Sequence, residues 1–187
     1  DEKGISFDIR PPVRVNPLFV ANQFLYGSNA RNYPHVGRII ESENRTKLVG
    51  VNQMIYIESD EKLDLGERLT VMGRHYPFDR NGVIGDVITY QGTVEITDKV
   101  RDKIYRGVII KSLDGIEGSP WLSREVVPTF TDDYVGRPNA KKFRVIGGGK
   151  DNVTRFYGQS DVLFLKGGAK DGVRVGDIMG IYKRRDI

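Results

Sequence analysis

The chain contains no cysteine, which excludes disulfide bonds, thiol catalysis and cysteine-ligated metal sites. It has only two histidines, His35 and His75, and neither has a metal-ligand companion at helical or hairpin spacing. We interpret His75, beside Arg74 and Tyr76, as a surface residue at a strand end. No run of about 18 apolar residues occurs, so no membrane-spanning helix is predicted. The first residues, DEKGISFDIRPP, lack the basic start and apolar centre of a signal peptide.

Enzyme motifs are equally scarce. No G-x-S-x-G elbow occurs, although composition alone does not exclude a Ser–His–Asp triad, and we interpret Gly118-Ser119-Pro120 as a turn. The run at 147–150, GGGK, lacks the flanking residues of a phosphate-binding loop and is typical of a strand end or hairpin. The acid pairs Asp60-Glu61 and Asp132-Asp133 lack the alternating ligands of a calcium loop. We therefore expect a non-enzymatic protein with no catalytic, cofactor-binding or metal-binding residues and no cofactor. Trp121 is expected to pack in the core.

Charge of either sign is not in large excess. The 29 basic residues are interleaved with 25 acidic ones, which leaves a net charge of +4 and an isoelectric point near 9.2. The densest basic cluster is Lys183-Arg184-Arg185, which we interpret as a solvated end. A nucleic-acid surface usually needs a denser stripe or a platform of aromatic residues.

What the chain does have is glycine, 22 residues of it, and many short runs rich in Val, Ile, Tyr, Phe or Thr. Such runs, bounded by Gly, Asn or Asp, predict strands. The sequence therefore predicts an all-β fold, with Asp79-Arg80-Asn81-Gly82 at a hairpin tip. The predicted strands are Val36–Ser42, Gln53–Glu58, Glu67–Gly73, Gly92–Thr97, Tyr105–Lys111, Lys141–Ile146, Asp161–Lys166 and Asp177–Lys183.

Helical periodicity is scarce, and only Pro17–Tyr26 indicates a short helix. Proline, glycine and acid content then suggests four parts. They are an extended lead-in over 1–34, a first β subdomain over 35–124, a connector over 125–140 and a C-terminal β segment over 141–187.

An internal repeat is the strongest sign of organisation. Asn44–Ile57 aligns without gaps on Asn152–Leu165, and Leu63–Val71 aligns on Val173–Ile181. In the second pair an apolar-x-Gly-acid corner recurs, with Gly66-Glu67 matching Gly176-Asp177. Glycine permits tight curvature there, and the acid can accept hydrogen bonds from the turn. The repeat of 44–71 in the C-terminal segment suggests paired small barrel-like subdomains; chance similarity between two β segments is the alternative.

Three stretches carry a resemblance to a known family: VGRIIESENRTKLVGVNQMIYI, DLGERLTVMGRHYPFDRNGVIGDVITYQGTVEI and QSDVLFLKGGAKDGVRVGDIMGIYKR. Their order resembles the C-terminal region of the TsaP-like family, the secretin-associated, LysM-containing proteins of type IV pilus systems. It is also similar to the SH3-like C-terminal domain of the flagellar ring protein FlgT. Two features depart from the family pattern: Gly118-Ser119-Pro120-Trp121-Leu122 stands where a Gly-Asp corner is usual, and no LysM-like segment is present.

The resemblance implies SH3-like barrels and a structural role in the periplasm. The expected partners are a secretin or another envelope ring protein and, through a LysM module upstream of Asp1, peptidoglycan; no nucleic acid and no membrane span are expected. A ring-forming homo-oligomer is also implied. Contact surfaces would lie in the lead-in 1–34, the connector 125–140 and the Asp79–Gly82 hairpin. The alternatives are a flagellar basal-body ring accessory, a nucleic-acid-binding β-barrel and a hydrolase or transferase.

Overall fold

The chain folds into two compact units, which we describe separately. The computed structural model describes residues 22–27, 29–80, 82–113, 115–126, 137–148, 157–158, 161–174 and 176–182, with only the backbone of Arg74 and His75. The first unit comprises residues 21–128 and 146–164, and we call it the barrel unit. The second comprises residues 1–20, 129–145 and 165–187, and we call it the C-terminal unit.

The described residues are all-β apart from two single-turn 3₁₀ helices, as the sequence predicts. No helix in this part of the chain has the length and apolarity needed to cross a bilayer. In chain order the elements are β1 (Gln23–Tyr26), η1 (Ala30–Asn32), β2 (Gly37–Ser42), β3 (Leu48–Val49), β4 (Met54–Glu58), β5 (Arg68–Arg80), β6 (Val83–Arg101), β7 (Ile104–Ser112), β8 (Ile116–Glu117), β9 (Trp121–Ser123), β10 (Arg137–Pro138), β11 (Arg144–Gly148), β12 (Leu163–Lys166), η2 (Ala169–Asp171) and β13 (Asp177–Ile178).

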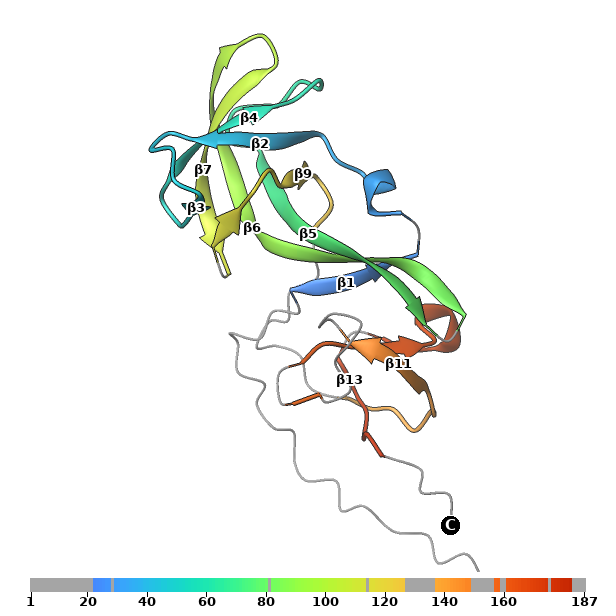
Figure 1. Ribbon diagram of the computed structural model, residues 1–187. Coiled ribbons are helices and arrows are strands. Elements are labelled where there is room, and N and C mark those ends of the chain that lie inside the picture. Colours follow the sequence, from blue (N-terminus) through green and yellow to red (C-terminus); the bar gives the residue numbers. More distant parts are fainter. Residues whose placement is uncertain are drawn as a thin grey trace, which may run out of the picture. The chain divides into compact units, whose positions relative to one another are not determined.

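Six strands close into a barrel in the order β6-β5-β9-β2-β4-β7, because β7 also pairs with β6 (Figure 1). The neighbouring strands around this ring pair antiparallel. Closure leaves no open sheet edge around the ring.

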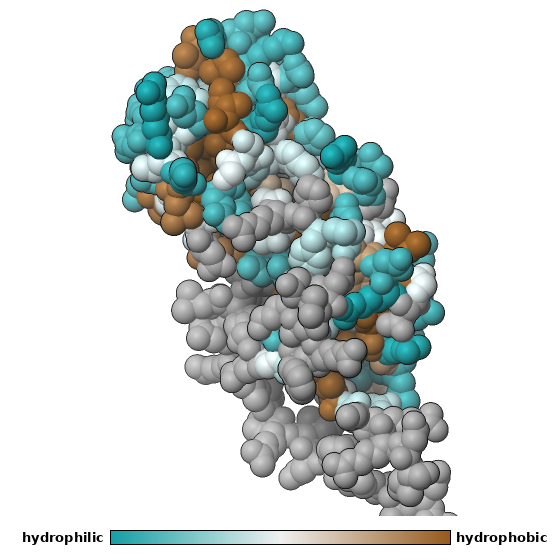
Figure 2. All heavy atoms as spheres, viewed as in Figure 1, coloured by the Kyte–Doolittle hydropathy of each residue, from teal (hydrophilic) through white to brown (hydrophobic). Residues whose placement is uncertain are grey.

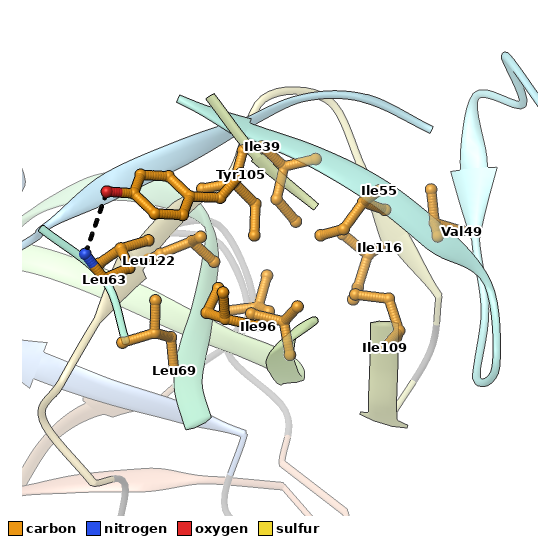
Figure 3. Close-up of a cluster of buried hydrophobic side chains, with 13 residues drawn as sticks. Ile39, Val49, Ile55, Leu63, Leu69, Ile96, Tyr105, Ile109, Ile116 and Leu122 are labelled. Carbon is orange, nitrogen blue, oxygen red and sulfur yellow. Dashed lines mark hydrogen bonds between the residues drawn. The ribbon is translucent and has the colours of Figure 1, made fainter. Parts of the chain in front are cut away.

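The barrel is filled by side chains that alternate along its strands. On β4, Ile55 and Ile57 are fully buried while Met54, Tyr56 and Glu58 are half-buried, the period of two expected of a strand with one face inward. The hydroxyl of Tyr105 accepts a hydrogen bond from the backbone N–H of Leu63 at 3.3 Å, so this polar atom is satisfied inside the core (Figure 3). The core consists of Ile39, Val49, Ile55, Ile57, Leu63, Leu69, Val71, Val94, Ile96, Tyr105, Ile109, Ile116 and Leu122.

The β5–β6 hairpin continues beyond the barrel strands, and its outer half has a core of its own. The ladder pairs Arg80 with Val83 across a two-residue loop, and Gly82 has a φ of 74°, which confirms the predicted hairpin tip. The rings of Phe78 and Phe164 meet edge to face at 5.6 Å. These two residues, together with Val87 and Ile146, form a second buried cluster. Strand β1 pairs with this outer part of β6.

The repeated glycine–acid corner is present in both copies. Gly66 and Gly176 have φ values of 81° and 88°, and each is followed by an acid whose N–H bonds back to the carbonyl three residues earlier, at 3.1 Å. Glu67 accepts the N–H of Asp64 at 3.0 Å, and Asp177 accepts the N–H of Arg174 at 3.0 Å. The earlier part of the repeat also shares a turn, since the N–H groups of Gly50 and Gly158 each donate at 2.6 Å to the side chain three residues later.

The expected pair of barrels is not found in the described residues. Strand β4 lies between β2 and β7 in the closed ring, whereas β12 pairs with β11 alone and β13 pairs with β10 in parallel. The same local turns are therefore embedded in different sheets. Residues 152–156 and 159–160 of the second copy lie outside the described residues.

The structure revises two further predictions, the helix over Pro17–Tyr26 and the connector over 125–140. The helix predicted over Pro17–Tyr26 is wrong for Gln23–Tyr26, which forms β1, because its residues pair with Asp86–Thr89 of β6; residues 17–21 lie outside the described part. The lead-in therefore contributes a strand to the barrel unit. In the 125–140 connector, Arg137–Pro138 forms β10, and residues 127–136 are outside the description. The GGGK run ends β11 at Gly148, as predicted, and 149–150 are not described.

Candidate binding surface

Two surface hollows lie on either side of the segment that joins β8 to β9. The first has a volume of about 410 Å³ and is lined by Met72, Gly73, Glu117, Gly118, Ser119, Pro120 and Trp121; we call it the Trp121 hollow. The second has a volume of about 470 Å³ and is lined by Ile39, Ile40, Glu41, Ser42, Arg45, Thr46, Lys47, Val49, Ile116, Glu117, Gly118 and Ser119; we call it the Arg45 hollow. Both share the exposed residues Glu117, Gly118 and Ser119, which we call the 117–119 ridge.

The ridge is held in place by strand pairing on both sides. Strand β8 pairs with β3, and β9 is bonded to both β2 and β5 as part of the barrel. The carbonyl of Pro120 accepts the N–H of Ile39 at 3.0 Å. Gly118 has a φ of 76°, a conformation that side chains rarely adopt, so the tight corner here depends on glycine. The sequence interpretation of this segment as a turn is confirmed.

Trp121 is not the core residue that the sequence suggests. Its side chain is half-buried and lines the hollow, and the neighbouring Leu122 points into the core instead. Successive residues of a strand face opposite sides of the sheet, so only one of the two can enter the barrel. His35 stacks on the indole ring, with centroids 5.9 Å apart and planes 28° from parallel.

The Arg45 hollow combines apolar and basic groups. Ile40 lies at the irregular position of β2, between the paired residues Ile39 and Glu41, and is 43% exposed. Arg45 has a φ of 54° and forms an ion pair with Glu41 at 3.3 Å. Lys47 is exposed and has no carboxylate partner among the described residues. Figure 2 shows a band of hydrophobic residues that crosses this side of the barrel, over β2.

The Ser42–Thr46 turn fixes the floor of this hollow. Ser42 is buried, and its hydroxyl oxygen accepts the N–H of Thr46 at 2.7 Å. The same oxygen lies 3.2 Å from the hydroxyl of Thr46. This network ties residues 42–46 together, so the hollow is preformed by hydrogen bonds rather than dependent on a ligand to shape it.

The pKa shifts of Lys103, Asp60 and Tyr33 are explained by local hydrogen bonding, charge and burial. The hydrogen bond between Lys103 and Asp60, at 2.7 Å, raises the pKa of the lysine and lowers that of the acid. Burial raises the pKa of Tyr33, and the nearby charge of Glu125 adds to the effect. No group of three His, Asp or Glu side chains that could hold a metal ion occurs among the residues described. The two hollows therefore offer a ligand a fixed surface with both apolar and charged groups.

The surfaces expected to make contacts do not line these hollows. The lining residues come from 39–49, 72–73 and 116–121, outside the 1–34 lead-in, the 125–140 connector and the Asp79–Gly82 hairpin. His35 faces Trp121, while His75 pairs through its backbone with Ile88 in the hairpin. Sequence reasoning missed Ile40 and Ser119, because only closure of the barrel brings their segments together.

Comparisons with known proteins identify no relative. The chain matches no protein-family model, no curated protein and no solved structure.

Proposed function

We propose that this chain is a non-enzymatic structural protein of a bacterial envelope machine, located in the periplasm and bound to the secretin ring of a type IV pilus system. The machine is suggested by the motif resemblance described above. The observation that supports docking is the pair of hollows that meet at one exposed ridge on a closed, filled barrel. A rigid surface of this kind can bind a partner without a large loss of conformational freedom.

The polarity of the hollows indicates the kind of segment that would bind. Ile40 and the half-buried Trp121 provide apolar contacts on the two sides of the 117–119 ridge. Lys47 provides a positive charge in the Arg45 hollow, and no carboxylate in the described part of the chain pairs with it. A partner segment with apolar side chains and an acidic group fits this combination, because the apolar groups are removed from water while the acid meets Lys47.

Binding can be tested by filling both hollows at once. Ser119 is exposed and lines both, so Ser119→Arg places a long side chain in the shared wall without disturbing the buried core. Leu65→Arg adds the same side chain at an exposed corner before β5 and is the matched control. Detergent extracts of envelopes are passed over each immobilised protein. We expect the secretin to be retained by the native chain and by Leu65→Arg, and to be lost with Ser119→Arg.

Other results would change the proposal. Retention of the secretin by Ser119→Arg would place the contact elsewhere on the chain. Retention of a flagellar ring component in place of the secretin would favour the flagellar alternative, which a loss of swimming rather than twitching on gene deletion would support independently. Retention of neither by the native chain would contradict the proposal.

A further inference from the structure

The C-terminal unit has more basic than acidic residues. Its full sequence, 1–20, 129–145 and 165–187, has 13 Lys and Arg against eight Asp and Glu, and its described residues, 137–145, 165–174 and 176–182, contain seven Lys and Arg against two Asp and no Glu. This imbalance contrasts with the near-balanced charge of the whole chain. Positive charge is thus concentrated in this small part of the molecule.

Both aspartates of this part are already bonded. Asp177 is almost enclosed, with 2% of its side-chain surface exposed, and is bound by the Arg137 guanidinium and by the amide of Asn139 at 2.6 Å. Asp171 accepts the N–H of Gly168 at 2.9 Å. The remaining cations have no carboxylate partner among the described residues. They are Lys141, Lys142, Arg144, Lys166, Lys170 and Arg174.

A larger share of the cations in the barrel unit form ion pairs. Seven of them form ion pairs with described carboxylates, and two of these, Arg106 and Arg124, contact two acids each. The seven are Arg38, Arg45, Lys62, Arg68, Lys103, Arg106 and Arg124. Six other described cations of the barrel unit, Lys47, Lys99 and Arg101 among them, have no such partner. The two units therefore differ in proportion among the described residues: seven of 13 cations are paired in the barrel unit and one of seven, Arg137, in the C-terminal unit.

The unpaired cations lie on two neighbouring segments. A side chain on Gly167 would meet the Phe143 ring at 2.5 Å, and one on Gly148 would meet the Val162 carbonyl at 2.8 Å. Strands β11 and β12 pair, and these contacts near their two ends bring the segment that carries Arg144 beside the one that carries Lys166. The ammonium group of Lys141 donates to the carbonyl of Asp171 at 2.6 Å, beside Lys170. We call Lys141, Lys142, Arg144, Lys166 and Lys170 the basic cluster.

Like charges brought close together on paired strands repel, so an anion that binds the basic cluster relieves this repulsion. Exposed apolar side chains follow in the chain: Ile181 and Tyr182 are 74% and 69% exposed. Ile178 is also an exposed apolar residue. Its backbone carbonyl accepts a hydrogen bond at 3.0 Å from the N–H of Asn139, which lies two residues before Lys141 of the basic cluster. Cations beside exposed aliphatic and tyrosine side chains are the combination that anionic bilayer surfaces attract, because phosphates meet the cations while the apolar groups enter the interface.

From these observations we propose that the C-terminal unit docks on an anionic phospholipid surface through the basic cluster, with Ile181 and Tyr182 at the lipid interface. A nucleic acid would demand stacking platforms. Of the two described aromatic rings in this unit, Phe143 packs over Gly167, which leaves Tyr182 alone to stack. The proposal rests on charge and exposure in the C-terminal unit and is independent of the secretin.

The test uses vesicle co-sedimentation with the full chain. Vesicles contain phosphatidylcholine alone or phosphatidylcholine mixed with phosphatidylglycerol. The cluster variant is Lys142→Gln/Arg144→Gln/Lys166→Gln. The control variant, Lys47→Gln/Lys99→Gln/Arg101→Gln, removes three charges of the barrel unit that have no carboxylate partner within the described ranges, so both variants have the same net charge. Thermal unfolding confirms that each variant folds.

We expect the native chain and the control to bind only the vesicles that contain phosphatidylglycerol, and the cluster variant to bind them about 100-fold more weakly. A further variant, Ile181→Ser/Tyr182→Ser, should retain binding at low salt and lose it at high salt. Equal weakening of the cluster and control variants would overturn the proposal, as would absence of binding. Tighter binding of the native chain to a single-stranded oligonucleotide than to the vesicles would also overturn it, in favour of a nucleic-acid partner.

Discussion

The side-chain amide of Gln91 occupies the space that any side chain at Gly73 would need. A Cβ atom built on Gly73 would lie 2.1 Å from the amide carbon of Gln91, which is far closer than two carbons can approach. Gln91 is the extra residue of a β-bulge, since Val71 pairs with Gly92 and Met72 with Tyr90. The two residues thus mark where the β5–β6 hairpin changes register as it leaves the barrel.

Gly73→Ala is therefore expected to destabilise the protein by about 1 to 3 kcal/mol through overpacking. Gly50→Ala is the control, because a Cβ there has only one contact, at 3.9 Å. Because the clash comes from the Gln91 side chain, Gln91→Ala should partly rescue Gly73→Ala, with a coupling free energy of about 1 kcal/mol. Denaturant unfolding of the single and double variants measures this coupling. Strict additivity would contradict the contact.

The buried side-chain oxygen of Gln91 allows a second test of the structure at this β-bulge. Its Oε1 atom is buried and accepts no hydrogen bond from the described residues. Leaving a polar atom unpaired in the interior is unfavourable, so Gln91→Met, which keeps the length and removes the amide, should leave the free energy of unfolding unchanged or raise it. A loss of more than about 2 kcal/mol in urea unfolding would show that the amide is satisfied in solution.

The core of the barrel and the tip of its hairpin should respond differently to one substitution. Ile57 is fully buried in the barrel core, while Ile84 near the hairpin tip is 72% exposed. Ile57→Ala should cost about 2 to 5 kcal/mol, because it removes buried methyl groups and leaves a cavity. Ile84→Ala should change stability by less than about 0.5 kcal/mol. Similar effects of the two variants on the urea midpoint would contradict the observed burial.

The second cluster should stabilise the hairpin locally. Phe164→Ala removes the ring that meets Phe78 edge to face, and with it the packing of β12 against the hairpin. Hydrogen exchange should therefore accelerate in β11, β12 and the outer half of β5 and β6. The amides of β4 and β7 should keep their protection, because these strands pair only within the barrel. Uniform acceleration across all strands would show that the two clusters unfold together.

The corner at Gly176-Asp177 should be sensitive to acid. Hydrogen bonds from the N–H of Arg174 and the amide of Asn139 lower the pKa of Asp177 to about 2, with help from Arg137. A folded-state pKa below the unfolded value contributes stability that is present above about pH 4 and is lost as the pH falls toward 2. Asp177→Asn should therefore lower the melting temperature near neutral pH, and its difference from the native chain should shrink below pH 4.

Asp102→Asn is the control for this substitution, since Asp102 is exposed in the β6–β7 turn. It should change the melting temperature little. Direct observation of the Asp177 carboxyl by carbon NMR should give a midpoint at about pH 2. A midpoint at about pH 4, the ordinary value for an aspartate, would contradict the hydrogen-bonded corner.

Local sequence signals predicted strand character and turns well, because both depend on neighbouring residues. The apolar run at 54–57, MIYI, which forms β4, and the Asn-Gly dipeptide at 81–82 are examples. The length of β6 was not predictable in this way: the prediction covered Gly92–Thr97, and the strand runs from Val83 to Arg101. Gly85 and Gly92 interrupt the run of strand-forming residues in β6. Both positions nevertheless require glycine, because a Cβ atom on Gly85 would lie 2.1 Å from the carbonyl oxygen of Tyr26 and one on Gly92 would lie 2.1 Å from that of Lys111.

The candidate site could not be predicted from the sequence, because it too depends on residues that are far apart in the chain. Strands β3, β8 and β9 have two or three residues each and exist because of partners far along the chain, such as Leu48 with Glu117. The hollows are formed by those long-range pairings. No local pattern at Ile40 or Ser119 indicates that they line one surface.

The most direct test of the docking surface is photo-crosslinking in living cells. A photoreactive amino acid is placed at position 119 on the ridge or, as the control, at the exposed position 65. The account predicts a crosslinked product between the chain and the secretin from position 119 and none from position 65. A product from position 65 alone, or the same yield from both, would contradict the claim that the partner binds at the 117–119 ridge.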